Sequence, residues 1–283
     1  MKSWLYCPGD VPGKMINAGI YDADGIVLDL EDSVSPDDKD EARILVSEAL
    51  AGYDFGPAVV TVRVNGTDSP WWREDIRSVI KAGAGILRLP KMESAEALKK
   101  ILTVITEAEE RKSGSGGGVR IQCILETPAG IENAFEIAGA AAGRLTGFCF
   151  GAEDYCTAVG IGRPGPDYAL DYPRSRVASA AASAGVECYD TVWSNFRDPE
   201  GLRSDALRAR SLGFSGKSLI HPDQIAIVNE IFSPTEKELE WACRVVENAG
   251  DSGRAVAIDG GMVDLPVLRR ARNILNGKHN ERN

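Results

Sequence analysis

Two acidic segments in the middle of the chain each follow an apolar run and are the first candidates for chemistry. Glu126 ends the run 121–125, and Glu153 and Asp154 follow the run 147–152. A carboxylate between a buried strand and the next helix is where an α/β enzyme places a catalytic or metal-binding group. Because successive strands deliver these acids to one end of a sheet, we expect Glu126 and Asp154 to lie close together.

Polar residues also follow the other apolar runs. Arg63 belongs to the run 58–64, and its planar guanidinium matches a carboxylate through two parallel hydrogen bonds. A site with several acids, one arginine and no cysteine pair favours a hard cation such as Mg²⁺, held by oxygen ligands. The other polar residues at these ends are Glu31, Asp32, Asn65, Lys91, Asp190, Asn195 and His221.

Each assignment has a structural alternative. Glu126 or Asp154 could cap the following helix. Arg63 could form a structural ion pair with Glu31. His221, which precedes Pro222 and Asp223 in the sequence, could order the last loop rather than act in catalysis.

Lys91 follows Pro90 at a strand end, where it could form a Schiff base with a carbonyl substrate. Nearby carboxylates would raise the pKa of this lysine and make it a poorer nucleophile, which favours an electrostatic or structural role. The sequence leaves both roles open.

The elements that must position these residues alternate regularly. Eight strand-like runs separated by helical segments predict a (β/α)8 barrel; the alternative, a doubly wound sheet, lacks support because no G-x-G-x-x-G follows the first run. The runs are 4–7, 25–30, 58–64, 85–89, 119–125, 146–151, 187–192 and 217–220. The expected helices are a short one ending near residue 21, then 37–50, 71–82, 94–112, 131–142, 172–184, 199–212 and 223–232.

Two more helical segments, 236–248 and 265–275, follow the last run and are separated by a Gly- and Asp-containing linker, 250–261. We therefore predict a catalytic barrel domain over residues 1–233 and a C-terminal helical extension over 234–283. The extension could pack on a neighbouring subunit.

Composition excludes several classes of protein. The chain has 283 residues and a formal net charge of −10 without a basic run, which argues against nucleic acid as a partner. No apolar stretch reaches the roughly 18 residues of a membrane span, and the N-terminus lacks signal-peptide architecture, so we expect a cytoplasmic protein. The six cysteines have no metal-type spacing, and those within apolar runs are expected to be buried thiols.

Taken in order, the motifs resemble those of the citrate lyase beta subunit and its relatives in the HpcH/HpaI aldolase superfamily, over nearly the whole chain. The resemblance implies a (β/α)8 barrel that assembles as a trimer or hexamer. The segments that carry it are Pro8-Gly9, Leu28-Asp29-Leu30-Glu31-Asp32-Ser33-Val34, Val62-Arg63-Val64-Asn65, Leu89-Pro90-Lys91, Glu126-Thr127, Gly151-Ala152-Glu153-Asp154, Gly216-Lys217 and Ile220-His221-Pro222 with Gln224.

The resemblance also implies an activity. Relatives of this type are Mg²⁺-dependent carbon–carbon lyases that cleave or form hydroxyacyl thioesters, such as citryl, malyl or citramalyl groups on CoA or an acyl-carrier protein, with an acyl thioester and a 2-oxo acid as the other partners. The family's metal ligands correspond to Glu126 and Asp154, and its substrate-carboxylate arginine corresponds to Arg63. Glu126 would thereby also contact the substrate.

Further site residues come from the resemblance alone. Glu31 and Asp32 match acids that surround the metal, often through water, and are catalytic candidates. A C-terminal Asp-Gly-x-Met segment that can close a neighbouring subunit's site reads Asp259-Gly260-Gly261-Met262 here, which makes Asp259 a third catalytic candidate. Gly261 stands where lysine or arginine is common in relatives.

Three other functions stay open from the sequence. The same site could hydrolyse a malyl-CoA-type thioester with water as the final acceptor, or act as a metal-dependent aldolase on free 2-oxo acids. The chain could also be a non-enzymatic barrel subunit that binds a carrier protein, although Arg63, Glu126 and Asp154 together argue against that.

Overall fold

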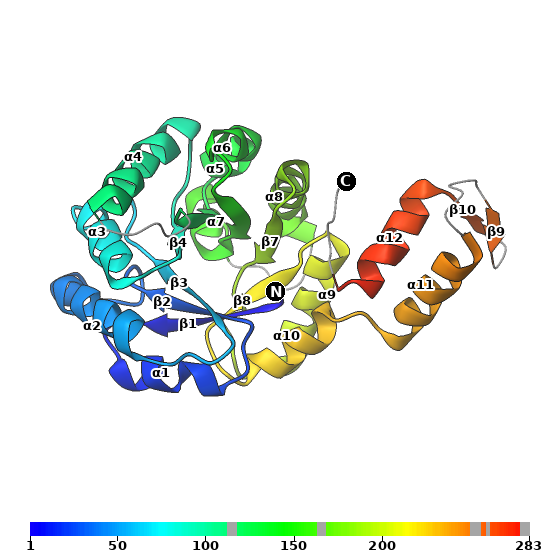
Figure 1. Cartoon of the computed structure of the whole chain (residues 1–283), viewed down its shortest axis with the longest axis horizontal. Helices are drawn as coiled ribbons and strands as arrows, with labels where there is room; N and C mark the ends of the chain where they lie inside the picture. The colour runs from blue at the N-terminus through cyan, green and yellow to red at the C-terminus, as the bar shows by residue number, and fades with distance from the viewer. Residues whose placement is uncertain (112–117, 163–167, 250–255, 259–260, 278–283) are drawn as a thin grey trace.

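The computed structural model describes residues 1–111, 118–162, 168–249, 256–258 and 261–277. Eight parallel strands, paired in chain order from β1 to β8 and closed by pairing of β1 with β8, form a barrel surrounded by helices (Figure 1). The predicted (β/α)8 fold is confirmed, and the doubly wound alternative is excluded because the sheet is closed.

The barrel strands fall close to the expected runs. Their bounds are β1 Ser3–Pro8, β2 Gly25–Asp29, β3 Val59–Arg63, β4 Ile86–Leu89, β5 Arg120–Leu125, β6 Leu145–Phe150, β7 Glu187–Asp190 and β8 Gly216–Leu219. The helices of the barrel are α1 Pro12–Asn17, η1 Ala18–Ile20, η2 Pro36–Asp38, α2 Lys39–Gly52, α3 Trp72–Ala82, α4 Ala95–Arg111, α5 Pro128–Glu132, α6 Ala134–Ala140, α7 Ala152–Val159, η3 Tyr168–Leu170, α8 Asp171–Ala184, α9 Pro199–Ser211 and α10 Gln224–Phe232.

Two of the helical predictions were incomplete. The helix expected over 131–142 is two helices, α5 and α6, which meet at Asn133. The helix α7, directly after β6, was not predicted. It begins at Ala152, so Glu153 and Asp154, which were expected at a strand end, lie in the first turn of a helix.

Side chains alternate between the barrel interior and the helix layer, as the period of a strand requires. Arg88 of β4 stacks on Trp4 and Tyr6 of β1, which lies across the barrel, so these side chains point inward. The interior also holds a small apolar cluster formed by Trp4, Val27, Ile124, Cys149 and Tyr189. Residues at the alternate positions of the strands, such as Leu5, Ile26 and Phe148, belong to the large core between the strands and the helices.

Local sequence explains where several helices begin. The side chains of Thr127 and Asp198 accept hydrogen bonds from backbone N–H groups three residues ahead, and a proline follows each of them. Such a cap satisfies one of the free N–H groups of the first turn, and proline is pre-organised for that position. Thr127 thereby fixes the chain directly after Glu126.

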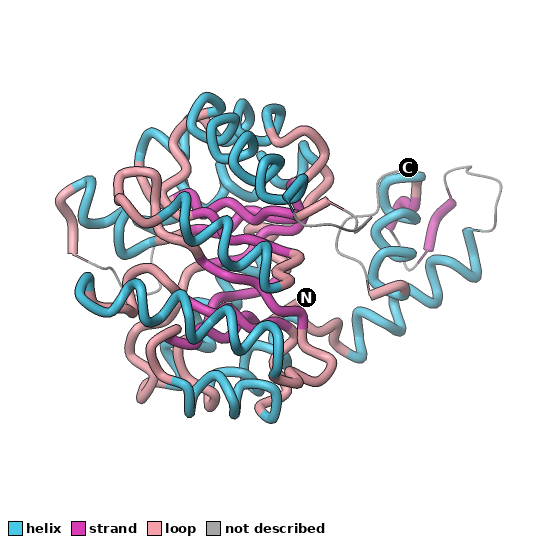
Figure 2. Tube along the Cα trace, turned by 60° about the vertical axis from the view of Figure 1, so that its left-hand side comes forward, coloured by secondary structure: helices cyan, strands magenta, loops and turns pink. Residues whose placement is uncertain are grey.

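The C-terminal segment forms its own small unit beside the barrel (Figure 2). Helices α11 (Glu236–Ala249) and α12 (Leu265–Leu275) pack through a separate apolar cluster. Between them lies an antiparallel pair, β9 (Val256–Ile258) and β10 (Gly261–Val263). The segment 250–261 was expected as a linker, and its residues 256–258 and 261 belong to this strand pair. The side chains of Arg210 and Glu238, 2.7 Å apart, join α9 to α11.

Two predictions from composition concern the cysteines and membrane spans. Cys7, Cys123, Cys149 and Cys188 are buried free thiols, as expected. Among the helices that the structure describes, none has the length and apolar character that a membrane span requires.

Candidate active site

A cavity of about 880 Å³ lies at the carboxyl ends of the barrel strands. Its lining residues come from many loops, and Arg63, Glu126 and Asp154 are among them. Apolar side chains such as Ile124 and Phe150 form part of the wall. This is the end of a barrel where catalytic groups are found, so the three main predicted residues share one cavity.

Glu126 is a deeply buried acid of the cavity. It is 3% exposed, and its Oε1 accepts a hydrogen bond of 2.7 Å from the backbone N–H of Lys91. Burial, together with the charges of Glu31 and Asp154, raises the pKa of Glu126 to about 8. A buried carboxylate that lacks an adjacent cation is one that a bound metal ion would stabilise.

Gly151 allows Glu126 to take this position. A Cβ atom at Gly151 would lie 2.5 Å from Oε2 and 2.6 Å from Cβ of Glu126, which is closer than atoms can pack. The backbone N–H of Ala152 donates to Thr191 at the end of β7, which fixes the start of α7 and hence Asp154. Sequence reasoning noted the Gly151-Ala152 pair but not its steric role.

Arg63 is held by acids on several sides. Its Nε and Nη2 donate to the two carboxylate oxygens of Asp29 at 2.6 and 2.7 Å. Its Nη1 lies 2.8 Å from Glu31 and 3.3 Å from Asp32. Burial lowers the pKa of Arg63, but Asp29 outweighs that effect and the net pKa lies well above the ordinary value. The ion pair with Glu31 is present, and Arg63 still lines the cavity.

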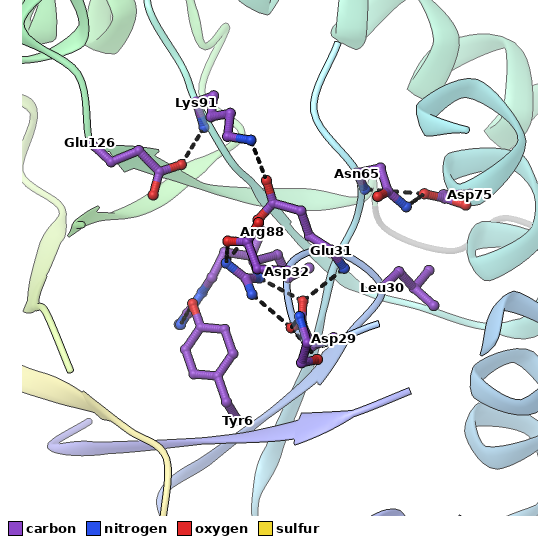
Figure 3. A network of polar contacts seen from close by, with 12 residues as sticks. Tyr6, Asp29, Leu30, Glu31, Asp32, Asn65, Asp75, Arg88, Lys91 and Glu126 are labelled. Carbon is purple, nitrogen blue, oxygen red and sulfur yellow. Dashed lines mark hydrogen bonds and ion pairs between the residues drawn. The ribbon is translucent and has the colours of Figure 1, made fainter. Parts of the chain in front are cut away.

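Glu31 and Lys91 lie behind the cavity lining. Figure 3 shows Lys91 between Glu126 and Glu31: its backbone N–H contacts the first, and its Nζ lies 3.4 Å from the second. Lys91 has a φ of 48°, a left-handed conformation that is uncommon for a residue with a side chain. This conformation lets one residue reach both carboxylates.

The charges of Glu31 and Lys91 respond to this arrangement. Burial raises the pKa of Glu31 to about 7, although Arg63 opposes the shift. Partial burial lowers the pKa of Lys91, but the charges of Glu31 and Asp68 outweigh it and the net pKa is raised. A protonated lysine is a poor nucleophile, so the environment of Lys91 favours the electrostatic role over a Schiff base.

We call Asp29, Glu31, Arg63, Lys91 and Glu126 the mouth cluster. Asp29 was not singled out as a site residue, although it stands in an apolar run and pairs in register with Arg63. That pairing follows from the alignment of β2 with β3, which the sequence does not specify. Asp32, with its side chain 55% exposed, lies at the rim of the cavity.

Three residues that were expected at the strand ends have other surroundings in the structure. Asn65 donates to the buried carboxylate of Asp75, and Asn195 is an exposed residue of the loop after β7. His221 lines the rim, accepts a hydrogen bond from the backbone of Asp223 and stacks on Phe196. These contacts favour a role for His221 in ordering the last loop. Asp259 lies outside the described residues.

Asp190 points away from the cavity into the helix layer. It forms a helix-side cluster with Arg174 of α8, Asp205 of α9 and Lys217 of β8, all of them almost completely buried. Arg174 and Lys217 each contact both carboxylates, at distances between 2.5 and 2.9 Å. Burial raises the pKa of Asp205, but the two cations lower it to about 2. The expectation that Asp190 faces the cavity was wrong. Side chains alternate along a strand, and Asp190 occupies one of the positions that point toward the helices.

A closed (β/α)8 barrel with an acid-lined cavity at its carboxyl end defines the class of this protein. The model of the HpcH/HpaI aldolase/citrate lyase family matches residues 2–222, and the chain belongs to that family.

Two kinds of curated relative resemble the chain over most of its length. The citrate lyase subunit beta of Leuconostoc mesenteroides subsp. cremoris is 40% identical over 97% of this chain and 92% of the relative. A (3S)-malyl-CoA thioesterase of Cereibacter sphaeroides is 36% identical over 97% of this chain and 93% of the relative.

A solved structure resembles this one equally broadly. CitE from Mycobacterium tuberculosis, in complex with magnesium, acetoacetate and coenzyme A, superposes with a TM-score of 0.80 and 30% identity, covering 97% of each chain.

Proposed function

We propose that this protein is a Mg²⁺-dependent carbon–carbon lyase that cleaves, or in reverse forms, a 3-hydroxyacyl thioester such as a citryl, malyl or citramalyl thioester. The products of cleavage would be an acyl thioester and a 2-oxo acid. The observation that carries the proposal is the meeting of Glu126, Asp154 and Arg63 in one cavity. The CitE structure with magnesium, acetoacetate and coenzyme A supports the same class of ligands.

The donor set of the cavity fits Mg²⁺. Glu126 and Asp154 supply carboxylate oxygens, and within the described part of the chain no three His, Cys, Asp or Glu side chains converge into a complete metal cage. Mg²⁺ is usually held by one or two carboxylates, with water and substrate oxygens completing its shell. When bound, the cation would polarise the substrate's hydroxyl or carbonyl oxygen and stabilise charge that develops there.

Arg63 would bind the carboxylate of the 2-oxo acid portion. Asp29 occupies the edge formed by Nε and Nη2, and Nη1 faces Glu31 and Asp32, so a ligand carboxylate would bind at Nη1 by taking the place of one of these acids. The ring of Tyr6, 4.9 Å from the guanidinium, supports it from one face. The guanidinium is thus ordered before a substrate arrives, which reduces the cost of binding.

Cleavage requires one proton to leave and another to arrive. The bond between the hydroxyl-bearing carbon and the carbon next to the thioester breaks, the hydroxyl proton passes to a base, and the carbon next to the thioester, left as an enolate, takes a proton from an acid. Glu31, with a pKa of about 7, can hold a proton near neutral pH. Asp32 and Asp259 remain the other catalytic candidates, and the segment 259–262 is proposed to close the site of a neighbouring subunit.

The assembly and the carrier are part of the proposal. We propose a homotrimer or hexamer in which the C-terminal unit contacts a neighbour, and a CoA or acyl-carrier-protein thioester as the substrate. A second function, hydrolysis of a malyl-CoA-type thioester, is supported by the similarity to (3S)-malyl-CoA thioesterases. A metal-dependent aldolase on free 2-oxo acids would instead act without CoA and would not be inhibited by it.

A panel of 3-hydroxyacyl-CoA thioesters, incubated with the full chain in Mg²⁺ or in EDTA, tests the proposal by the masses of the products. We expect an acyl-CoA and a 2-oxo acid in Mg²⁺ and no turnover in EDTA. Free CoA with an intact hydroxy acid would identify the thioesterase instead. Turnover that survives EDTA, or that survives the substitution Glu126→Ala, would contradict the metal-dependent mechanism.

A further inference from the structure

We propose that Asp29 is a positioning residue that, with Ser33, sets the orientation of Arg63 and thereby the affinity for the substrate's carboxylate. The inference rests on the proposed role of Arg63 and adds a residue that acts through this arginine. It also specifies which edge of the guanidinium is held by the protein: the edge formed by Nε and Nη2, which Asp29 occupies.

The carboxylate of Asp29 is fixed by many contacts and acts as an anchor for the guanidinium of Arg63. Its side chain is almost fully buried and accepts five hydrogen bonds. Two come from Arg63, at 2.6 and 2.7 Å. Ser33 donates through its hydroxyl at 2.5 Å and its backbone N–H at 3.2 Å, and the N–H of Glu31 donates at 3.0 Å. With its oxygens engaged in this way, the carboxylate is fixed in both position and plane.

The charge of Asp29 supports the same role. Burial raises its pKa, but Arg63 and Ser33 outweigh that effect and the net pKa is lowered, so the residue is an anion at neutral pH. A bidentate carboxylate also fixes the plane of a guanidinium, which a single hydrogen bond would not do. Asp29 and Arg63 are paired neighbours on β2 and β3, so the anchor is built into the barrel rather than into a mobile loop.

The other end of the guanidinium faces two acids. Arg63 Nη1 lies near Asp32 and Glu31, and Asp32 lines the cavity. A ligand carboxylate would therefore reach Nη1 from the cavity in place of one of these acids. If the anchor is removed, the long side chain regains rotamer freedom, and a ligand must order it again on binding.

The test measures binding of pyruvate, glyoxylate and oxaloacetate in Mg²⁺ by calorimetry for the wild type, Asp29→Asn and Ser33→Ala. Asp29→Asn keeps the shape but replaces one acceptor by a donor that faces Arg63. We expect it to weaken the best 2-oxo acid on the order of 10- to 100-fold, as removal of outer-shell partners does. Ser33→Ala removes one hydrogen bond and should weaken binding by about two- to tenfold.

A double-mutant cycle distinguishes a positioning role of Asp29 from a general disturbance of the folded structure. If Asp29 acts only through Arg63, Asp29→Asn should add little to the loss already caused by Arg63→Lys. The matched control is Asp75→Asn: Asp75 is also fully buried and binds an arginine, Arg43, at 2.8 Å, but it does not line the cavity. This control should lower thermal stability without changing 2-oxo acid affinity.

The possible failures are distinguishable. If the wild type binds none of the three acids, or if Arg63→Lys leaves their affinities unchanged, the proposed role of Arg63 fails and the inference fails with it. If Arg63→Lys weakens binding but folded Asp29→Asn and Ser33→Ala do not, only the positioning role is overturned. Fully additive effects of Asp29→Asn and Arg63→Lys would also overturn it. Should Asp29→Asn not fold, Ser33→Ala alone decides the outcome.

Discussion

The mouth cluster and the helix-side cluster are both buried groups of charged residues on the same barrel, but their charges are arranged differently. In the helix-side cluster, two cations face two carboxylates, and each cation contacts both acids. In the mouth cluster, Arg63 and Lys91 face Asp29, Glu31 and Glu126, and the charges of Asp32 and Asp154 add to the acidic side.

This difference appears in the pKa values. The pKa of Asp205 falls to about 2, whereas those of Glu31 and Glu126 rise to about 7 and 8. A balanced cluster stabilises its own ionised form, whereas a cluster with more acids than cations does not ionise all of its acids readily. We conclude that the helix-side cluster serves the fold and that the mouth cluster retains a charge excess suited to binding a cation. Four experiments test this difference between the two clusters.

Lys217→Met should produce the largest effect, because it leaves Asp190 and Asp205 with one cation between them. Breaking a buried pair on one side costs about 3–5 kcal/mol, so the free energy of unfolding, measured with denaturant, should fall by that amount. The double substitution Lys217→Met with Asp205→Leu restores charge balance and should recover part of the loss. A Lys217→Met protein of wild-type stability would show that the helix-side cluster contributes nothing to the fold.

In contrast to Lys217→Met, Glu126→Gln should lower Mg²⁺ affinity without lowering the stability of the fold. It removes a proposed metal ligand, so Mg²⁺ affinity should fall by at least about 100-fold, the upper range for loss of a mere outer-shell partner. The stability of the metal-free protein at pH 8 should not fall, because an acid with an unfavourable environment has been neutralised. A large loss of stability with intact Mg²⁺ affinity would reverse the assignment of the two clusters.

The two clusters should also give opposite pH dependences of stability. Because the folded-state pKa values of Glu31 and Glu126 exceed the ordinary 4.5, their contribution is complete below about pH 4.5 and is lost as the pH rises through about 7 and 8. Asp205 contributes fully above its ordinary pKa of 3.8, and this contribution is lost as the pH falls toward 2.

Denaturant unfolding in EDTA at pH 5 and pH 8 isolates the mouth contribution. The wild type should lose more stability between these two values than Glu126→Gln does. Equal losses in both proteins would mean that Glu126 is an ordinary carboxylate.

The test for a Schiff base at Lys91 should give the smallest effect, because we expect no adduct at all. After incubation with pyruvate or glyoxylate and borohydride, intact mass spectrometry should find no added mass, because the raised pKa of Lys91 keeps it protonated. A stoichiometric adduct mapped to Lys91, with activity that survives EDTA, would replace the metal mechanism by a Schiff-base mechanism.

Much of the barrel could be predicted because each strand is a short apolar run bounded by helix-forming segments. The helix α7 was missed because its first residues, Ala152, Glu153 and Asp154, were interpreted only as a site motif. The pair β9 and β10 was missed because three-residue strands among glycines carry no clear period. The order of the longer elements can thus be predicted from the local sequence pattern, whereas such short elements cannot.

The site was predictable to the level of strand ends but not of side-chain direction. Asp190 and Glu126 both follow apolar runs, yet one faces the helix layer and the other the cavity. A shift of one residue along a strand moves a side chain from one face of the sheet to the other, so the direction of each acid depends on the exact strand bounds. The roles of Asp29, Gly151 and the backbone of Lys91 depend on contacts between different strands, which no single segment reveals.

Titration of Mg²⁺ into the metal-free protein at pH 6 and pH 8, followed by calorimetry, tests the central claim most directly. We predict one ion per chain, tighter binding at pH 8 because the raised pKa values of Glu31 and Glu126 oppose binding at pH 6, and loss of this binding in Glu126→Gln and Asp154→Asn. Binding that is independent of pH and unchanged in both variants would contradict the assignment of the mouth cluster as the metal-binding centre.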